Sequence, residues 1–329
     1  MGIKRTIKSN AAKVKRTALG AHMEFTVIRE IDGASSSTLR NYKQSFYYYT
    51  KYNNFDADTP IDYLTRDSVL LWVKSMQTDG KKVTTINHYL RDVRAFLYWC
   101  MDSERGFIEP YTISEVKGQE SAPKAFDIDD IETLSNKPKQ SNSFNDWRTW
   151  AIVNWIIGTG NRSNTVCNVQ IGDVDFKNAE IYLRETKNKK FAYIPLSPRL
   201  AAVLKEYMAE FNDYFKAAQA TDYLFPNSSG EQLSTNALRH SFSRYCAERG
   251  VTQTNLHGLR HSFAENFLRL GGNIFKLQHI LGHSTLDMTK KYVRFSIDDL
   301  KEDFASVSPL DNLSSGKLSR GSRIKRNKR

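Results

Sequence analysis

Four side chains in the C-terminal third of the chain could bind and attack an anion. His257 and Arg260 lie three residues apart, His283 follows Leu281-Gly282, and Tyr292 stands nine residues further on. A guanidinium is the side-chain group best shaped to bind phosphate oxygens in pairs. A tyrosine hydroxyl becomes a covalent nucleophile when a base or a positive field offsets its pKa of about 10. Two imidazoles and an arginine could provide both, so these residue types predict chemistry on an anion.

Three short helices are expected to bring these side chains around one point. The first carries His257 and Arg260 on one face, because residues three apart are neighbours on a helix. The second spans Asn273–Leu281, and the third carries Tyr292 near its end. The residues expected to end or open these helices are the glycines Gly271-Gly272 and Gly282, and a capping box of Ser284 with Asp287.

The order and spacing of these residues resemble the C-terminal signature of the tyrosine recombinases, the phage-integrase family. That signature is H-x-L-R-H, then L-G-H, then a tyrosine about nine residues later. The matching segments are His257-Gly258-Leu259-Arg260-His261, Leu281-Gly282-His283 and Tyr292. Each segment alone is a weak signal, whereas the ordered set with this spacing is specific.

Arg162 is a second anchor of the resemblance. In the family, the first catalytic arginine follows T-G-x and precedes a helix and a D-x-D turn into a hairpin. Here Thr159-Gly160-Asn161-Arg162 is followed by Asp173-Val174-Asp175-Phe176. The family usually has an acidic residue three positions after this arginine, supporting it. This chain has Thr165 there, which leaves open how Arg162 is held.

The resemblance implies a role for each of these residues. Tyr292 would attack a DNA phosphate and form a 3′-phosphotyrosyl link, while Arg162 and Arg260 hold the non-bridging oxygens. His257 would move the tyrosine proton as general base and then acid, and His283 would donate a hydrogen bond to the phosphate. The covalent link conserves phosphodiester energy and the arginines replace a metal, so no cofactor, metal ion or ATP is expected.

A catalytic lysine is expected in the second turn of a small sheet, where the family places it. Lys187, Lys189 and Lys190 all lie there. The family pattern favours Lys187, which would protonate the leaving 5′-oxygen. Lys189 and Lys190 are then candidates for DNA contacts, or form a solvated hairpin tip.

Composition indicates a folded protein with real cores. The 329 residues are 40% hydrophobic and 12% aromatic, which excludes a disordered chain. No apolar run approaches the roughly 20 residues of a membrane span, and no apolar segment of a secretory signal follows the basic N-terminus. The three cysteines are too widely spaced for a disulfide framework or a zinc site, so a reducing cytoplasm is expected.

The net charge of +12 resides in two tails. Residues 1–22 hold six Lys/Arg and residues 312–329 hold seven, with no acid in either, which leaves 35 basic and 36 acidic residues between them. Basic arms are typical of nucleic-acid contacts, although solubilising disorder would also explain them. On DNA they would add sequence-independent, salt-sensitive affinity for phosphates.

The expected fold is mainly α with a small antiparallel β-sheet. Five segments are predicted: a basic arm 1–22, a helical domain 23–109, a linker 110–125, a catalytic domain 126–305 and a basic tail 306–329. The helical domain resembles the family's core-binding domain, which clamps DNA, and the next resembles its mixed α+β catalytic domain. Thr84–Asp102 has the clearest helical period. Arg91 and Arg94 beside its apolar stripe are candidate DNA contacts or part of a solvated face.

Further elements follow from periodicity and caps. The expected helices are Thr38–Tyr52, Val69–Met76 with Asp67 as cap, a helix capped by Asp127, Trp147–Ile157, Arg199–Phe215, a helix from Ser234 to Arg249, and one from Ser296 to about Ala305. Asp175–Asn178 is expected to turn into Ile181–Arg184, and Thr186–Lys190 into Phe191–Leu196, a pattern that fits a three-stranded antiparallel sheet.

Other functions fit the same residues less well. His257 and His261 have the spacing of a zinc pair, but no glutamate follows His257 and no third ligand is near, so His261 is interpreted as a packed or supporting histidine. A type IB topoisomerase shares the tyrosine chemistry and is the rival enzyme. A DNA-binding protein without catalysis would explain the basic arms but not the ordered motif. A kinase or helicase would need a phosphate-binding G-x-x-x-x-G-K-[ST] loop, which is absent.

The family resemblance also implies partners. Its members act as tetramers on two paired double-stranded DNA sites, exchanging strands through a Holliday junction. We therefore expect recombination sites on DNA, a homotetramer and accessory DNA-bending proteins as partners, and no membrane. The last helix either docks into a neighbouring protomer, as in the family, or packs within its own chain.

Overall fold

A computed structural model describes residues 16–118, 125–139, 143–184, 192–290 and 292–293. The chain divides into two compact units, Met1–Ser121 and Ala122–Arg329. The division falls inside the segment predicted as a linker. Helices dominate the described residues and the named strands form one small antiparallel sheet, which confirms the predicted fold class.

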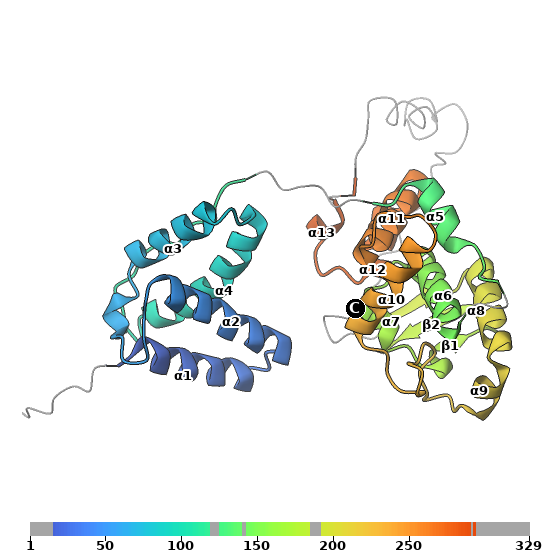
Figure 1. Ribbon diagram of the computed structural model, residues 1–329, viewed down its shortest axis with the longest axis horizontal. Coiled ribbons are helices and arrows are strands. Elements are labelled where there is room, and N and C mark those ends of the chain that lie inside the picture. Colours follow the sequence, from blue (N-terminus) through green and yellow to red (C-terminus); the bar gives the residue numbers. More distant parts are fainter. Residues whose placement is uncertain (1–15, 119–124, 140–142, 185–191, 291, 294–329) are drawn as a thin grey trace, which may run out of the picture. The chain divides into compact units, whose positions relative to one another are not determined.

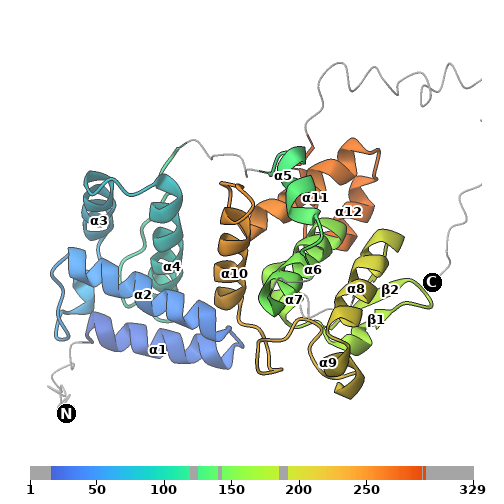
Figure 2. The ribbon, with the colours of Figure 1, turned by 45° about the vertical axis from the view of Figure 1, so that its right-hand side comes forward.

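Within residues 16–118, four α-helices form the N-terminal unit (Figure 1). They are α1 (Ala18–Ile31), α2 (Ser36–Tyr52), α3 (Arg66–Thr78) and α4 (Val83–Met101), with a 3-10 helix η1 (Ile61–Tyr63) before α3. Figures 1 and 2 show α1 and α2 side by side, and both contact α4. The side chains of Thr17, Ser35 and Thr65 accept backbone N–H groups at the starts of α1, α2 and α3.

The core of this unit is aromatic. The ring of His22 stacks on Phe46 with centroids 3.9 Å apart and meets Phe96 edge-on at 5.0 Å. Burial lowers the pKa of His22 to about 4, so this ring is neutral at pH 7. The apolar stripe predicted on α4 is buried, which confirms its helical period; its members are Ile86, Leu90, Val93, Leu97 and Cys100.

The C-terminal unit is built around α6 (Phe144–Thr159). This helix contacts α5 (Ile128–Ser135), α8 (Pro198–Glu210), α10 (Thr235–Ala247) and α11 (Leu256–Arg269). The buried side chains of α6 project from all sides of the helix, as expected for a helix inside a core. The other helices of the unit are α7 (Ser163–Cys167), η2 (Ile171–Asp173), α9 (Asn212–Ala217), α12 (Ile274–Leu281) and α13 (Asp287–Lys290).

The sheet has the order β1 (Val174–Asp175), β2 (Glu180–Leu183), β3 (Ala192–Pro195), with antiparallel pairing throughout. Ile181 of β2 pairs with Val174 on one side and Ile194 on the other, and all three side chains are buried. The segment Thr186–Lys190, which holds the predicted second turn, lies outside the described residues. The predicted strand Asp175–Asn178 is wrong beyond its first residue, because the Asp175 carboxylate accepts the backbone N–H groups of residues 177 and 178 and closes a turn.

Two helix starts differ from the prediction. The first helix begins at Ala18, inside the predicted basic arm, because Thr17 caps it. The cap of α3 is Thr65 rather than Asp67: the Thr65 side chain accepts from Ser68 N, and the Ser68 hydroxyl accepts from Thr65 N. This reciprocal pair is a capping box.

Two helices are shorter than predicted. The expected helix Arg199–Phe215 is interrupted at Phe211, whose backbone leaves the helical region (φ −115°, ψ 42°). Its ring packs edge-on against Phe144, 4.9 Å away. The helix before Tyr292 begins only at Asp287, since the Ser284 hydroxyl contacts the Met288 sulfur instead of capping the chain. Tyr292 therefore lies beyond the end of α13.

None of the described helices is long and apolar enough to cross a membrane. Cys100, Cys167 and Cys246 are all buried free thiols. Burial raises their pKa values, that of Cys167 to about 11. The three sulfurs therefore pack as thiols and supply no thiolate. The helix predicted from Ser296 lies outside the described residues.

Candidate active site

Two glycines reverse the chain between α11 and Tyr292. Gly271 follows α11 with φ 79°, and Gly282 ends α12 with φ 61°. Glycine adopts this left-handed conformation without the steric cost that other residues incur. The reversals bring Leu281 and His283 back against the face of α11 that carries Arg260.

The guanidinium of Arg260 is almost completely buried, with 2% of the residue exposed. Its Nη1 donates to the Gly160 carbonyl at 2.7 Å, and its Nη2 donates to the Leu281 carbonyl at 2.9 Å. The same Nη2 lies 2.9 Å from Nε2 of His283. Burial, together with the charge of Arg162, lowers the pKa of Arg260 to about 10. Arg260 is therefore still a fixed positive charge at neutral pH.

Arg162 also contacts the Leu281 carbonyl. It follows Gly160, which ends α6 in the left-handed conformation (φ 65°), and its Nη1 lies 3.4 Å from the Leu281 carbonyl. Burial lowers the pKa of Arg162. Within the described part of the chain, neither arginine forms an ion pair with a carboxylate. Two converging cations without an anionic partner make a site for an anion.

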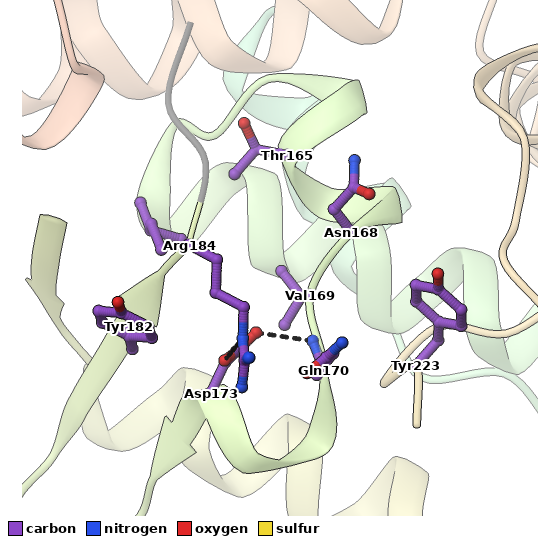
Figure 3. A pocket seen from close by; sticks show the side chains of 9 residues that line it. Thr165, Asn168, Val169, Gln170, Asp173, Tyr182, Arg184 and Tyr223 are labelled. Atoms are coloured by element: carbon purple, nitrogen blue, oxygen red, sulfur yellow. Dashed lines mark hydrogen bonds and ion pairs between the residues drawn. The ribbon is translucent and has the colours of Figure 1, made fainter. Parts of the chain in front are cut away.

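A neighbouring pocket, drawn in Figure 3, holds the acidic residue Asp173. It shares Thr165 with the hollow between the arginines. Asp173 is buried in it, accepting from Arg184 Nε at 2.6 Å and from Gln170 N at 2.8 Å. Figure 3 shows Asp173 turned toward Arg184, at the opposite side of the pocket from Thr165. This carboxylate does not replace the acidic residue that the family usually has; the described hydrogen bond of the Arg162 guanidinium is to the Leu281 carbonyl.

Tyr292 is buried beside the arginines, with 7% of the residue exposed. Its Oη lies 2.8 Å from Nδ1 of His261. Its ring is nearly parallel to that of His283, with 9° between the planes and 6.4 Å between the centroids. Burial raises the pKa of Tyr292, and the positive charges of the two arginines oppose that rise. The phenol thus has both an imidazole contact and a positive field.

The contacts of His283 determine its tautomer. A guanidinium can only donate hydrogen bonds, so Nε2 of His283 accepts from Arg260. The ring hydrogen of neutral His283 then sits on Nδ1 and is donated to the Thr289 hydroxyl, 2.8 Å away. Thr289 is fully buried in α13, so this bond ties the orientation of His283 to the segment that carries Tyr292.

The two histidines of α11 occupy different surroundings. His257 is exposed at the start of the helix, and its ring meets that of His261 edge-on with centroids 4.5 Å apart. His261 is buried and contacts Tyr292. Sequence reasoning assigned His261 no catalytic role; its position directly after Arg260 was the available signal. Among the described residues, no group of three or more His, Cys, Asp or Glu side chains is arranged to hold a metal.

An amide beside Arg162 was also missed. Asn161 is 4% exposed, and its Nδ2 has no hydrogen-bond partner among the described residues. It lines the same hollow as Arg162 and Arg260. Burying an unpaired donor costs about 1–3 kcal/mol, so an oxygen that enters the hollow would find a donor that is otherwise unsatisfied.

The other predicted residues lie elsewhere. The hairpin lysines, which are Lys187, Lys189 and Lys190, fall outside the described residues. Arg91 and Arg94 are on α4 of the N-terminal unit. Arg94 pairs with Glu115 at 3.2 Å, and Nη2 of Arg91 lies 2.9 Å from the His88 ring. These contacts engage part of each guanidinium, and a role on DNA stays a prediction.

Replacing Gly160 with alanine is expected to damage both stability and the site. A Cβ there would lie 2.4 Å from the Phe263 ring and 2.7 Å from the Leu281 side chain, and φ is +65°. Overpacking of this kind costs roughly 1–3 kcal/mol, and the left-handed backbone adds about 1–2 kcal/mol. The displaced carbonyl would no longer hold Arg260. Urea unfolding measures the stability loss, and the rate of DNA cleavage measures the loss at the site.

Gly250→Ala is the matched control, because Gly250 has φ +72° with no atom within 4 Å of the added Cβ. Gly250→Ala should lose only the stability that the left-handed backbone costs, and it should cleave DNA at the wild-type rate. Equal effects of the two substitutions on unfolding and cleavage would contradict the role given to the Gly160 carbonyl.

Known proteins are similar to this chain. The family model described as "Phage integrase family" matches residues 124–297, more than half of the chain. The tyrosine recombinase XerC of Chlamydia caviae is 25% identical over 256 residues, covering 77% of this chain and 81% of its own. The chain belongs to the phage integrase family and is a tyrosine recombinase, which confirms the resemblance in its sequence.

Solved structures share the fold. The integrase of transposon Tn1549 in complex with transposon right end DNA superposes with a TM-score of 0.68 at 18% identity, covering 89% of this chain and 99% of that one. A lambda integrase tetramer bound to a Holliday junction gives a TM-score of 0.66 at 15% identity, covering 86% of this chain and 78% of that one.

Proposed function

We propose that the protein is a site-specific DNA recombinase in which Tyr292 attacks a backbone phosphate and becomes linked to a 3′ end. One observation carries this most directly: a buried phenol lies 2.8 Å from an imidazole and within the field of two arginines. A tyrosine kept only for packing would need neither the imidazole nor the converging charges.

The phosphate is bound between the two arginines. Arg162 and Arg260 give its non-bridging oxygens charge-assisted hydrogen bonds, and the Nδ2 of Asn161 is a further donor. Charge builds on these oxygens in the transition state, so donors fixed in advance lower the barrier. The carbonyls of Gly160 and Leu281 fix Arg260 before the substrate arrives.

Cleavage forms a bond from the Tyr292 oxygen to phosphorus and breaks the bond from phosphorus to O5′. The phenol proton passes to an imidazole of α11, and the sequence predicts His257 for this role. The departing 5′-oxygen takes a proton from Lys187, the residue that the family resemblance favours. His283 donates to the phosphate once its Nε2 carries a hydrogen. Rejoining runs the same steps backwards, with a 5′-hydroxyl as nucleophile.

Two paired double-stranded DNA sites are the proposed substrate, bound by a homotetramer. The lambda integrase tetramer on a Holliday junction shares the fold of this chain. Arg91, Arg94, Lys189 and Lys190 are proposed contacts to the DNA backbone, and accessory DNA-bending proteins are proposed partners. A cytoplasmic location is proposed, because the substrate is DNA and the three cysteines are free thiols.

Chelation is expected to leave cleavage unchanged, because the arginines and the tyrosine provide the chemistry without a metal. The full chain is incubated with a supercoiled plasmid carrying the DNA that flanks its gene, in EDTA, and the reaction is stopped with SDS. The expected product is protein attached to 3′ ends at one mapped sequence. Loss of cleavage in EDTA, restored by added Mg²⁺, would indicate a metal-dependent nuclease instead.

Other outcomes identify the rival functions. Relaxation with 3′ attachments scattered over the plasmid would indicate a topoisomerase. If no attachment forms, the test is repeated with a nicked half-site duplex from the DNA that flanks the gene, which removes the need for a second cleavage partner. Binding to that duplex without covalent attachment would indicate a DNA-binding protein without catalysis.

A further inference from the structure

The hydroxyl of Tyr292 contacts a buried imidazole. Its Oη lies 2.8 Å from Nδ1 of His261, within the positive field of Arg260. A phenol can donate its hydrogen, and Nδ1 of His261 accepts it when the ring hydrogen of His261 is on Nε2. The contact therefore places a base at the proton that the nucleophile must lose.

Burial isolates this pair from bulk water. His261 and Tyr292 are each 7% exposed, whereas His257 is exposed at the start of α11. A proton that leaves a buried oxygen moves most readily to a base already bonded to it, since geometry is the first requirement for general base catalysis. The buried base in contact with the phenol is His261.

The charged and titratable neighbours of the pair come from three segments. Arg260 and Glu265 lie with His257 on α11, Arg162 precedes α7, and His283 follows α12. The arginines favour the phenolate by their positive charge. Glu265 is one turn from His261, so its negative charge would favour the imidazolium that forms when His261 takes the proton.

We infer that His261 is the catalytic base that takes the proton of Tyr292, and that His257 acts behind it as a positioning residue. The O–H bond of Tyr292 breaks, the proton moves to Nδ1 of His261, and the freed electron pair of Oη forms the bond to phosphorus. The electron pair of the P–O5′ bond leaves with the 5′-oxygen. On rejoining, His261 returns its proton to the departing tyrosine oxygen. This rests on the proposed function and names the base for its first step.

Asparagine and alanine at position 261 separate hydrogen bonding from proton transfer. His261→Asn places an amide oxygen close to the position of Nδ1, so it keeps an acceptor for the phenol but cannot take a proton. His261→Ala removes both. His257→Asn, on the same helix, tests the competing assignment of the base to His257. Each full-length variant is compared with wild type on a nicked duplex built on the mapped site, in single-turnover reactions, with DNA binding and thermal unfolding measured separately.

The expected result is a loss of covalent-complex formation by roughly 10²–10⁴-fold in His261→Asn with DNA binding unchanged. A duplex with sulfur in place of the bridging 5′-oxygen needs no proton on its leaving group, and the same loss is expected on it. The rate of His261→Asn should rise by about tenfold per pH unit at high pH, where hydroxide takes the proton. His257→Asn should lose less than about tenfold.

Three outcomes would overturn the inference. His261→Asn cleaving at the wild-type rate would leave no role for His261 as base, and a large loss in His257→Asn alone would move the role to His257. Faster cleavage by His261→Asn would mean that the contact restrains Tyr292 instead. If His261→Asn does not fold, His261→Ala is tested with added imidazole, which should restore cleavage. Folded His261→Ala that imidazole does not restore would count against the inference. A wild-type protein that forms no covalent complex would instead refute the proposed function itself.

Discussion

Tyr292→Phe is expected to abolish DNA cleavage while DNA binding and folding survive. The substitution removes one oxygen and leaves the ring, which packs with Ala264, Leu277 and Leu281. Loss of the bond to His261 should lower the free energy of unfolding by about 1 kcal/mol. Without a nucleophile no covalent bond can form, so the rate should fall by at least about 10⁴-fold, as for other catalytic nucleophiles.

The measurement is the amount of protein attached to 3′ ends after SDS on the nicked duplex, with a gel shift for binding. Tyr245→Phe is the matched control, because Tyr245 is also fully buried in the C-terminal unit and its hydroxyl donates to the Leu134 carbonyl at 3.1 Å. It should lose stability to a similar extent and cleave DNA at the wild-type rate. Covalent attachment by Tyr292→Phe would show that another residue is the nucleophile.

Arg260→Lys is expected to lose catalysis even though it keeps the positive charge. Removing one positioned donor to a developing oxyanion costs roughly 10²–10³-fold in rate. A single ammonium cannot bind the Gly160 and Leu281 carbonyls and two phosphate oxygens together, which the forked guanidinium can. We therefore expect a rate loss of at least about 10²-fold, and a larger one for Arg260→Ala, which removes the charge as well.

Stability should change less than catalysis in this variant. Leaving the two carbonyls unpaired costs about 1–3 kcal/mol, but removing a buried cation relieves part of its desolvation. Arg148→Lys is the control: Arg148 is 3% exposed, its Nη1 donates to the Pro226 carbonyl at 2.6 Å, and it does not line the hollow between the site arginines. It should lose stability and keep its cleavage rate. Wild-type cleavage by Arg260→Lys, or an equal rate loss in Arg148→Lys, would refute the assignment.

Local patterns in the sequence determined the elements and the order of the site. The apolar stripe of α4 is buried as its spacing predicts, and Ser35, Ser234 and Asn273 cap the helices that follow them. Periodicity and capping depend on residues within a few positions of each other, so a sequence displays them directly. The motif around Arg260 and the motif before Arg162 were legible for the same reason, and both lie within the segment that matches the phage integrase family.

Only the tertiary structure decided which groups touch. Arg260 binds the carbonyl of a residue 100 positions earlier, and the imidazole in contact with Tyr292 is 31 positions away. Backbone carbonyls carry no residue identity, so no motif could show that Gly160 and Leu281 hold the arginines. The choice between two histidines four positions apart depended on burial: α11 turns His261 toward Tyr292 and leaves His257 exposed. The sequence thus predicted Tyr292, the two arginines and two of the histidines, and the packing of α11, α12 and the segment after α13 decided the contacts that each one makes.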